Sequence, residues 1–334
     1  MVSIADVARE ADVSPTTVSH VLSGLRRVSA PRALAVREAM EKLQYTPSRA
    51  ARSLATGATK MLALVVPDIS NSFFAELAKG AESAAQAYGY NILLANTDFN
   101  HDKERAYLEL ITSKAVDGVI YAAGLPPTAR ELKSVLGELP TVLVDEEVAN
   151  TEFDVVVSEN DIGGGLIAEH LLALGHRRCL IVDAPDAPTS NALRVKGFLS
   201  AWEAAEGRAW LEHGDFTFES GVDALQRTSE LMKRERITSV FATNDLMGFG
   251  AMSALSSQGV NVPSDVSLVG FDDVFAAKFV APSLTTVKQD VAALGRISVE
   301  LLLKRLADLN VPQHRLTVPV ELVTRQSTGQ VQLA

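Results

Sequence analysis

Polar side chains follow the ends of several short apolar runs in this sequence, where they could hold a small ligand. The segment "DISNSFF" follows "LALVVP" and supplies Ser70, Asn71 and Phe73. Other polar residues follow later runs, and Arg194 opens "RVKGFLSAWEAA": Asp145 after "TVLV", Asn244 and Asp245 after "SVFAT", Asp272 and Asp273 after "VSLVGF", Gln289 after "LTTVK". Carboxylates, amides and one guanidinium hydrogen-bond hydroxyl groups, while aromatic rings cover C–H faces. The set favours a neutral polyhydroxylated ligand, a sugar or a nucleoside.

These residues can meet only if the apolar runs are strands of an open sheet. The runs alternate with helical patterns such as "FFAELAKGAESAAQAYG", and they occupy residues 61–66, 90–95, 118–122, 141–144, 154–157, 179–182, 239–243 and 266–271. Continuous short apolar runs are typical of parallel strands buried on both faces. The strand number exceeds one compact half, so the sequence predicts an α/β fold with two parallel sheets. Ligands of such sheets bind beyond the carboxyl ends of the strands.

A second group of candidate contacts lies in the first 45 residues. Ser3 and Asp6 predict a capping box at the start of one helix, and Ser14 with Pro15 predicts the start of a second. Asp12 falls in the tight turn between them, where a left-handed backbone is expected and Asp tolerates it. A third helix is expected after "RRVS", capped by Ser29 and with an apolar side: Leu34, Val36, Met40 and Leu43.

Helix, short turn, second helix and supporting third helix are the parts of a helix-turn-helix DNA reader. The outer face of the second helix would present short hydroxyls and an imidazole, which suit base edges and phosphates: Pro15, Thr16, Thr17, Ser19 and His20. The alternative is a small three-helix domain with solvated Thr and Ser side chains.

The charge of the chain is divided unevenly along its length. Residues 1–58 hold eight Lys and Arg against five Asp and Glu, whereas the remainder holds 23 against 36, within a net charge of −10 over 334 residues. A basic head on an acidic body suggests that only the head meets a polyanion. No apolar stretch approaches the roughly 18 residues of a membrane span, and "MVSIADVARE" lacks the features of a secretory signal. With Cys179 as the single cysteine, these features favour the cytoplasm.

The ordered motifs resemble one family along nearly the whole chain. "IADVAREADVSPTTVSHVLSGLRRVS" and "LQYTPSRAARSLATG" are similar to the DNA-binding head and hinge of the LacI/GalR family of bacterial transcription regulators. "LALVVPDISNSFFAELAKG", "VDGVI", "LGHRR", "FATNDLMGFGAM", "VPSDVSLVGFDD" and "SLTTVKQD" match that family in order. The resemblance implies a sensor with the two-lobed periplasmic sugar-binding fold. In ribose-binding relatives, the matching positions contact ligand: Phe73, Asp145, Arg194, Asn244, Asp272 and Gln289.

The resemblance also gives the basic segment "SRAARSLA" a role. A segment this short is not a stable helix alone, because isolated helices below about 12 to 15 residues are marginal in water. On an operator, the resemblance implies that two such hinge helices fold side by side in the minor groove. Leu54 would then enter the central base step, and Arg49 and Arg52 would neutralise nearby phosphates.

Three departures from the family pattern are visible. Asp12 stands where the family usually has Gly, and Pro15 opens the recognition helix where a base-contacting side chain often sits. Glu146 and Glu147 follow Asp145, where many sugar-binding members have an Arg or an aromatic residue. The added negative charge weakens the expectation of ribose itself and disfavours a phosphorylated ligand.

Several residues have structural explanations. Phe74 is expected in the core, and Asp245 and Asp273 are equally compatible with helix caps and with ligand contacts. The remaining set is expected to be structural: Trp202 and Trp210 in packing, Gly163, Gly164 and Gly165 in close helix packing, His176 at a helix end and Cys179 within a strand.

The sequence therefore predicts a regulator, most simply a repressor, with four parts: a helix-turn-helix domain (1–45), a hinge (46–59), a ligand-binding and dimerisation domain (60–327) and a tail (328–334). It would bind a pseudo-palindromic operator as a homodimer, a tetramer being open, and respond to a sugar or nucleoside. Neither a cofactor nor a metal site is predicted. The alternative is a hydrolase that uses Asp145 and Asp272 as acid and base. Whether the effector releases or recruits the repressor is left open.

Overall fold

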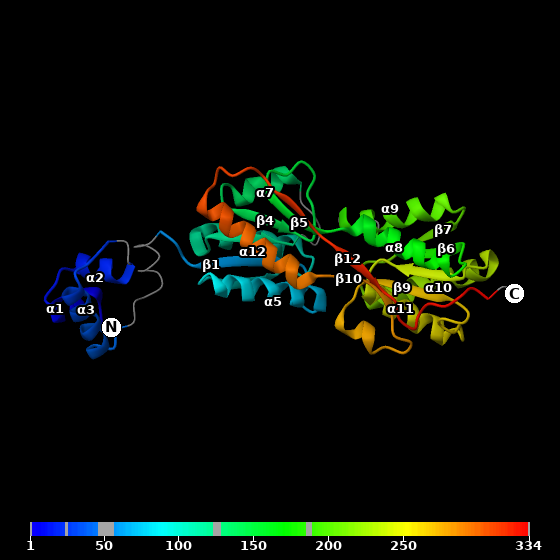
Figure 1. Ribbon diagram of the computed structural model, residues 1–334, viewed down its shortest axis with the longest axis horizontal. Coiled ribbons are helices and arrows are strands. Elements are labelled where there is room, and N and C mark those ends of the chain that lie inside the picture. The colour runs from blue at the N-terminus through cyan, green and yellow to red at the C-terminus, as the bar shows by residue number, and fades with distance from the viewer. Residues whose placement is uncertain (1, 24–25, 46–56, 123–127, 185–188, 333–334) are drawn as a thin grey trace.

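The structure is a computed structural model that describes residues 2–23, 26–45, 57–122, 128–184 and 189–332. Figure 1 shows a small helical head at the N-terminal end and two α/β lobes. Each lobe has its own sheet with helices on both faces, which agrees with the predicted fold class. Within the described residues, no helix has both the length and the apolar content that a bilayer span requires.

The head consists of helices α1 (Ile4–Glu10), α2 (Pro15–Ser23) and α3 (Ala30–Lys42). Ser3 caps α1 as predicted: its Oγ accepts a hydrogen bond from the Asp6 amide at 3.3 Å, and the Asp6 carboxylate accepts one from the Ser3 amide at 2.9 Å. The amide of Thr17 donates to Ser14 Oγ at 3.1 Å at the start of α2. Between the helices, Asp12 has a φ of 50°, the expected left-handed conformation.

Two expectations for α3 are wrong in detail. Ser29 occupies the N-cap position, but its side chain makes no capping hydrogen bond. Leu34 is 55% exposed, because it lies two residues before the buried Val36 and a helix turns about 100° per residue. The inner face of α3 is instead set by Val36 and Ala39, with Met40 and Leu43 packed against them.

The first lobe has a six-stranded parallel sheet with the order β11-β5-β4-β3-β1-β2. Its strands are β1 (Met61–Val66), β2 (Asn91–Asn96), β3 (Gly118–Tyr121), β4 (Thr141–Val144), β5 (Asp154–Ser158) and β11 (Arg315–Val318). Helices α5 (Ser72–Ala87) and α12 (Val291–Ala307) cover one face. The other face packs against α6 (His101–Leu110), the π-helical turn η1 (Ile111–Ala115) and α7 (Ala129–Leu136).

The second lobe repeats this plan with the order β12-β10-β9-β8-β6-β7, in which only β12 is antiparallel to its neighbour. Its strands are β6 (Arg178–Asp183), β7 (Arg208–His213), β8 (Ser239–Ala242), β9 (Ser267–Asp272), β10 (Thr285–Gln289) and β12 (Val320–Val323). Helices α8 (Asn160–Ala173) and α9 (Thr189–Ala204) cover one face. Helices α10 (Phe218–Glu235) and α11 (Asp245–Ser257) cover the other, and the short 3-10 helix η2 (Phe275–Lys278) follows β9.

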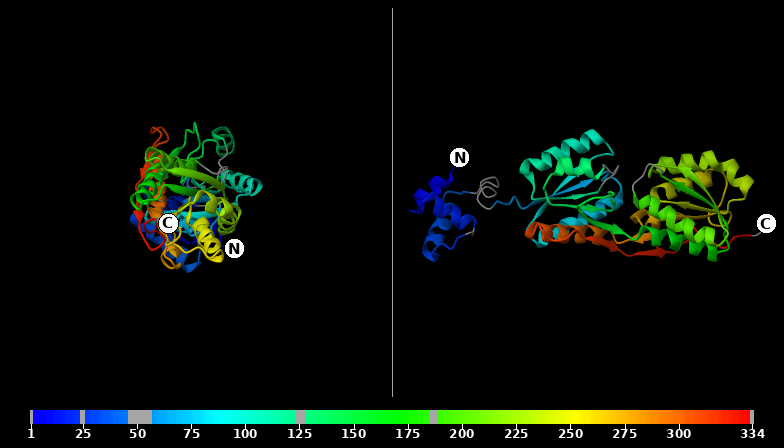
Figure 2. Two further views of the ribbon diagram at one scale, coloured as in Figure 1. Left: turned by 90° about the vertical axis from the view of Figure 1, so that its right-hand side faces the viewer. Right: turned by 90° about the horizontal axis from the view of Figure 1, so that it is seen from above.

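The chain passes between the lobes at three places in the described part. It leaves the first lobe between β5 and α8, returns between β10 and α12, and leaves again between β11 and β12. The red C-terminal segment makes the last of these crossings along the side of the molecule (Figure 2). Residues beyond β12 then pack on the second lobe, where the Leu268 amide donates to the Ser327 carbonyl at 2.8 Å. These three short connections are the expected hinge for a movement of one lobe relative to the other.

The glycine run at 163–165 brings α8 and α9 together. A Cβ on Gly164 would lie 2.0 Å from the carbonyl oxygen of Arg194, and one on Gly197 would lie 1.9 Å from that of Asp161. Only residues without a side chain fit at these two crossings, which agrees with the predicted close packing. The contact fixes the position of Arg194 on α9.

Candidate ligand cleft and nucleic-acid interface

A cavity lies between the two lobes, beyond the carboxyl ends of strands from both sheets. Its walls combine four aromatic rings with carboxyl, amide, hydroxyl and guanidinium groups: Pro67, Asn71, Phe73, Phe74, Phe99, Asp145, Glu146, Ser190, Arg194, Phe216, Asn244 and Asp272. Six of the residues that the sequence singled out as ligand contacts meet here. Ser70 and Gln289 are not among the lining residues.

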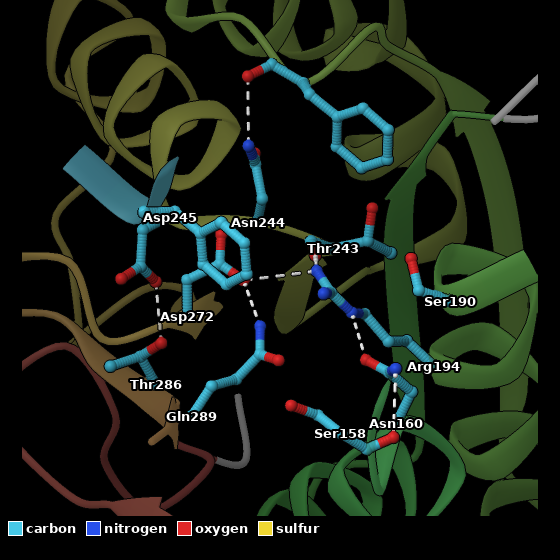
Figure 3. Close-up of polar contacts among 12 residues, drawn as sticks. Ser158, Asn160, Ser190, Arg194, Thr243, Asn244, Asp245, Asp272, Thr286 and Gln289 are labelled. Carbon is cyan, nitrogen blue, oxygen red and sulfur yellow. Dashed lines mark hydrogen bonds and ion pairs between the residues drawn. The ribbon is translucent and has the colours of Figure 1, made fainter. Parts of the chain in front are cut away.

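Arg194 is the centre of the polar network in the second lobe (Figure 3). Its Nε donates to Asn160 Oδ1 at 2.9 Å, and its Nη1 donates to the Thr243 carbonyl at 2.8 Å. Nη1 also lies 3.3 Å from Asp272 Oδ1, and the guanidinium stacks 4.0 Å from the centroid of the Phe271 ring. These contacts hold a buried guanidinium in one orientation, so it is positioned before any ligand arrives.

Asp272 closes β9 with a backbone φ of 114°, a region that side chains rarely adopt. Gln289 supports its carboxylate from β10, donating from Nε2 to Oδ1 at 2.8 Å (Figure 3). Burial raises the pKa of Asp272 to about 7, with Arg194 opposing the rise and Asp145 adding to it. Gln289 therefore positions a carboxylate that lines the cavity, and it is not itself among the lining residues.

Asp145 and Glu146 enter the cavity from the end of β4. Asp145 has a φ of 68°, and its Oδ1 is buried with no hydrogen-bond partner in the described part of the chain. Glu146 is held by the first turn of α9, because Oε2 accepts from the Ser190 amide at 3.1 Å and Oε1 accepts from the Ser190 hydroxyl. Burial, followed by the charge of Asp145, raises the pKa of Glu146 to about 8.

The other acidic residues behind the strand ends are structural. Asp245 is fully buried and accepts from the Thr286 hydroxyl at 2.6 Å and the Val274 amide at 2.9 Å. Asp273 accepts from Arg325 Nη2 at 2.5 Å. Neither lines the cavity, so the structure favours the structural explanation over ligand contact for both.

Asn71 and Asn244 have two roles each. Both line the cavity and cap a helix: Asn71 Oδ1 accepts from the Phe73 amide at 3.0 Å, and Asn244 Oδ1 accepts from the Met247 amide at 2.9 Å. Asn244 Nδ2 also donates to the Phe216 carbonyl at 3.0 Å. Ser70, in contrast, is exposed and donates its hydroxyl hydrogen to Asp68 Oδ1 at 2.7 Å.

Four aromatic rings form the apolar part of the cavity. Phe73 and Phe74 meet edge to face with centroids 5.1 Å apart at the start of α5. Phe74 packs against the first core, as expected, but it also lines the cavity. Phe99 and Phe216 follow β2 and β7, and both have a left-handed backbone.

Several buried polar atoms near the cleft make no hydrogen bond within the described chain. Thr243 Oγ1, Gln289 Oε1 and Ser158 Oγ are buried without a partner in the described chain. Figure 3 shows these side chains around Arg194 and Asp272. Because unpaired buried polar atoms are unfavourable, they are ready to accept a water molecule or a ligand group.

The predicted nucleic-acid contacts on α2 differ in exposure. Pro15 and Thr16 are exposed, while Ser19 and His20 are half-buried. Ser3, Ser14 and Thr17 take part in the helix caps, and Ser14 Oγ lies 3.0 Å from Thr17 Oγ1. Arg49, Arg52 and Leu54 of the predicted hinge lie outside the described residues.

Two family models match this chain. Residues 3–48 match "Bacterial regulatory proteins, lacI family", and residues 168–328 match a periplasmic binding protein-like domain. The chain is 37% identical over 330 residues to the ribose operon repressor of Halalkalibacterium halodurans, covering 98% of this chain and 97% of that protein. It is 34% identical over 335 residues to the HTH-type transcriptional repressor PurR of Mannheimia succiniciproducens, covering 99% and 100%. The chain belongs to the LacI family.

A solved LacI-family structure has a similar fold over nearly the whole chain. The lac repressor dimer bound to operator and the anti-inducer ONPF superposes with a TM-score of 0.84 and 28% identity, over 98% of this chain and 99% of that chain. The chain is thus a LacI-family transcriptional repressor and not an enzyme, so the hydrolase alternative is wrong. Within the described ranges, no group of three or more His, Cys, Asp or Glu could hold a metal ion.

Three residues of this LacI-family chain that were expected to be structural are buried: His176, Trp202 and Cys179. His176 is buried between Thr238 Oγ1 at 2.9 Å and Ser267 Oγ at 3.0 Å. Trp202 is fully buried against Phe198, with ring centroids 4.9 Å apart. Burial of Cys179 raises the pKa of its thiol to about 12, which leaves it unreactive.

Six lining residues were not singled out as ligand contacts: Pro67, Phe74, Phe99, Glu146, Ser190 and Phe216. Phe99 and Glu146 follow β2 and β4, so reading the residues after every strand would have found both. Phe216 follows β7, a strand that the sequence pattern did not reveal. Ser190 lies in the first turn of α9 after β6. Its role depends on contact with Glu146, 44 residues away in the chain.

Proposed function

We propose that this repressor binds a pseudo-palindromic operator as a homodimer and that a small polyhydroxylated molecule in the cleft changes its affinity for DNA. The observation that carries the proposal is the cleft network, in which Arg194, Asp272 and Asn244 meet between two lobes that follow a helix-turn-helix head. The protein would work in the cytoplasm, where operator DNA lies.

The lining of the cleft suits a small polyhydroxylated ring. Hydroxyl groups would donate to Asp272 and Asp145 and accept from Arg194, while Phe73 and Phe216 cover the C–H faces of the ring. The name of the related ribose operon repressor supports a sugar as the first candidate. The charge of Glu146 nevertheless separates this pocket from one made for a neutral pentose alone.

Ligand control requires different affinities for two conformations. The two lobes are joined by three short crossings, and a ligand that contacts both lobes favours their closed arrangement. We propose that closure changes the distance between the two heads of a dimer through the segment 46–56. This segment carries Arg49, Arg52 and Leu54, and its proposed folding on DNA rests on its sequence.

An exposed aromatic pair supports the proposed dimer. Phe275 and Phe279 on and next to η2 are 72% and 70% exposed, with ring centroids 4.9 Å apart. Neighbouring exposed rings on a soluble protein are typical of interaction surfaces. We propose that this pair packs against the same surface of a second copy, because homodimers with twofold symmetry are the commonest oligomers.

The test begins by selecting DNA with the full-length protein from a random pool at moderate salt. The proposal expects two inverted half-sites centred about one helical turn, or about 10 base pairs, apart. The exposed Thr16 then gives a precise variant, since Thr16→Ala removes a hydroxyl that takes no part in the helix caps. We expect a loss of about tenfold or more in operator affinity, as for one base contact in each head.

Ser253→Ala is the matched control, because Ser253 is an exposed hydroxyl on α11 of the second lobe. Its operator affinity should equal that of the wild type. Selection of no consensus, or equal effects of the two alanine variants, would contradict the proposed mode of DNA reading.

A further inference from the structure

The cleft has an excess of buried negative groups. Asp145, Glu146 and Asp272 line it, and each is at most 8% exposed. Arg194 is the basic residue among the lining residues, and its described contacts go to Asn160, Thr243 and Asp272. Because the pKa of Glu146 is raised to about 8, this carboxyl group holds a proton at pH 7 that a bound cation would displace. With all three carboxyl groups ionised, the described wall of the cleft has two uncompensated negative charges.

Glu146 is held in place and keeps free acceptor capacity. The amide and hydroxyl of Ser190 each donate to one of its oxygens. The donors belong to the first turn of α9, a 16-residue helix whose N-terminal end favours an anion. A carboxylate offers about four acceptor positions, so Glu146 can still receive hydrogen bonds from a ligand.

Asp145 adds a second, independent indication. It is 92% buried, lines the cavity and has an Oδ1 without a partner in the described chain. A neutral hydroxyl could satisfy one such oxygen, but it would leave the charge of two adjacent carboxylates uncompensated. A phosphate or carboxylate on the ligand would add repulsion to this wall.

The apolar wall is also compatible with a cation. Phe73, Phe74, Phe99 and Phe216 line the same cavity, and the faces of aromatic rings attract ammonium groups. Carboxylates beside aromatic rings therefore give a protonated amine both a charged partner and a covered apolar surface.

We propose that the effector is a small polyol that carries a protonated amine, such as an amino sugar or an imino sugar, with its nitrogen at Glu146 and Asp145. Its hydroxyl groups are bound by Asp272, Arg194 and Asn244. The inference rests on the proposed function, because it names the ligand class of the same cleft. It makes Glu146 the residue that separates cationic from neutral polyols.

The experiment compares two matched pairs by calorimetry with the full-length protein at pH 7. The pairs are 1,4-dideoxy-1,4-imino-D-ribitol against D-ribose, and D-glucosamine against D-glucose. We expect at least one cationic member to bind about tenfold or more tightly than its neutral partner, as for a charge-assisted hydrogen bond.

Glu146→Gln tests the residue itself, because glutamine keeps the shape of the side chain without the charge. Its amide oxygen can accept from the Ser190 amide, and its NH2 group can donate to the Ser190 hydroxyl. The variant should lose the preference for the cationic probe and bind it about tenfold more weakly. Glu147→Gln is the control, since Glu147 is paired with Arg315 and does not line the cavity. It should keep the wild-type ratio.

Neutral probes that bind as tightly as cationic ones would overturn the inference, and so would a Glu146→Gln variant with an unchanged ratio. Failure of both cationic probes to bind would also overturn it. Operator affinity is measured on the same preparations: a selective operator complex without amine preference refutes only the inference, whereas loss of operator selectivity refutes the proposed function.

Discussion

Glu146→Gln should stabilise the ligand-free protein above neutral pH and leave its stability unchanged in acid. Burial and the neighbouring Asp145 raise the pKa of Glu146 from 4.5 to about 8 in the folded protein. Between these values the folded state holds a proton that the unfolded chain has lost. The free energy of unfolding of the wild type therefore falls as the pH rises from about 4.5 to 8.

The size of the effect follows from the same shift. Each pKa unit corresponds to about 1.4 kcal/mol, so the rise to about 8 sets a ceiling on the order of 5 kcal/mol at pH 8. Part of the shift comes from the charge of Asp145, which titrates together with Glu146, so we expect about 2 kcal/mol. At pH 4.5 the protonated Glu146 resembles glutamine, and the difference should vanish.

The assay is urea unfolding of the full-length protein at pH 4.5, 6.5 and 8, followed by circular dichroism. The midpoint of Glu146→Gln should exceed that of the wild type increasingly from pH 6.5 to 8. Glu147→Gln should run parallel to the wild type, because its half-exposed ion pair with Arg315 contributes at most about 1 kcal/mol. A urea midpoint of Glu146→Gln that follows the wild-type midpoint at all three pH values, or lies below it at pH 8, would contradict the raised pKa of Glu146.

Three further predictions concern the ligand, the dimer and the hinge. Asp272→Ala should abolish the response of operator binding to ligand while the ligand-free protein still binds operator; unchanged ligand affinity in calorimetry would remove Asp272 from the site. Phe275→Ser with Phe279→Ser should shift the protein from dimer to monomer in sedimentation and weaken operator binding at least about tenfold, and an unchanged dimer would exclude this surface. Leu54→Ser should weaken selective operator binding far more than binding to random DNA, and equal losses would indicate a simple tether.

Several features that depend on residues close together in the sequence were predicted correctly. The capping box of Ser3 and Asp6, the left-handed Asp12 and the apolar runs depend on neighbours along the chain, and all are present in the structure. The strands β7, β11 and β12 were not predicted. In β7 the run "RAWLEH" mixes half-buried and exposed positions at a sheet edge and includes three charged or polar residues, so it lacks a continuous apolar signal.

The sequence predicted the cleft residues that lie at strand ends. It did not predict those whose position depends on contacts between distant parts of the chain. Asp145 follows β4 and Asp272 ends β9, so the rule for open sheets brought them together. The contact of Glu146 with Ser190 links β4 to α9 across the lobes, and no local pattern encodes it. Gln289 also ends a strand, β10, yet its side chain supports the carboxylate of Asp272, because side-chain direction is set by packing in the second lobe.

The most direct test of ligand control is the fluorescence anisotropy of a selected operator during titration with protein. It is repeated with pentoses, hexoses, their amino and imino analogues, and nucleosides. We expect at least one member of this panel to change the apparent Kd for operator about tenfold or more, and we expect Asp272→Ala to remove the change. An operator affinity that no member of the panel alters, or an equal response in Asp272→Ala, would contradict the account.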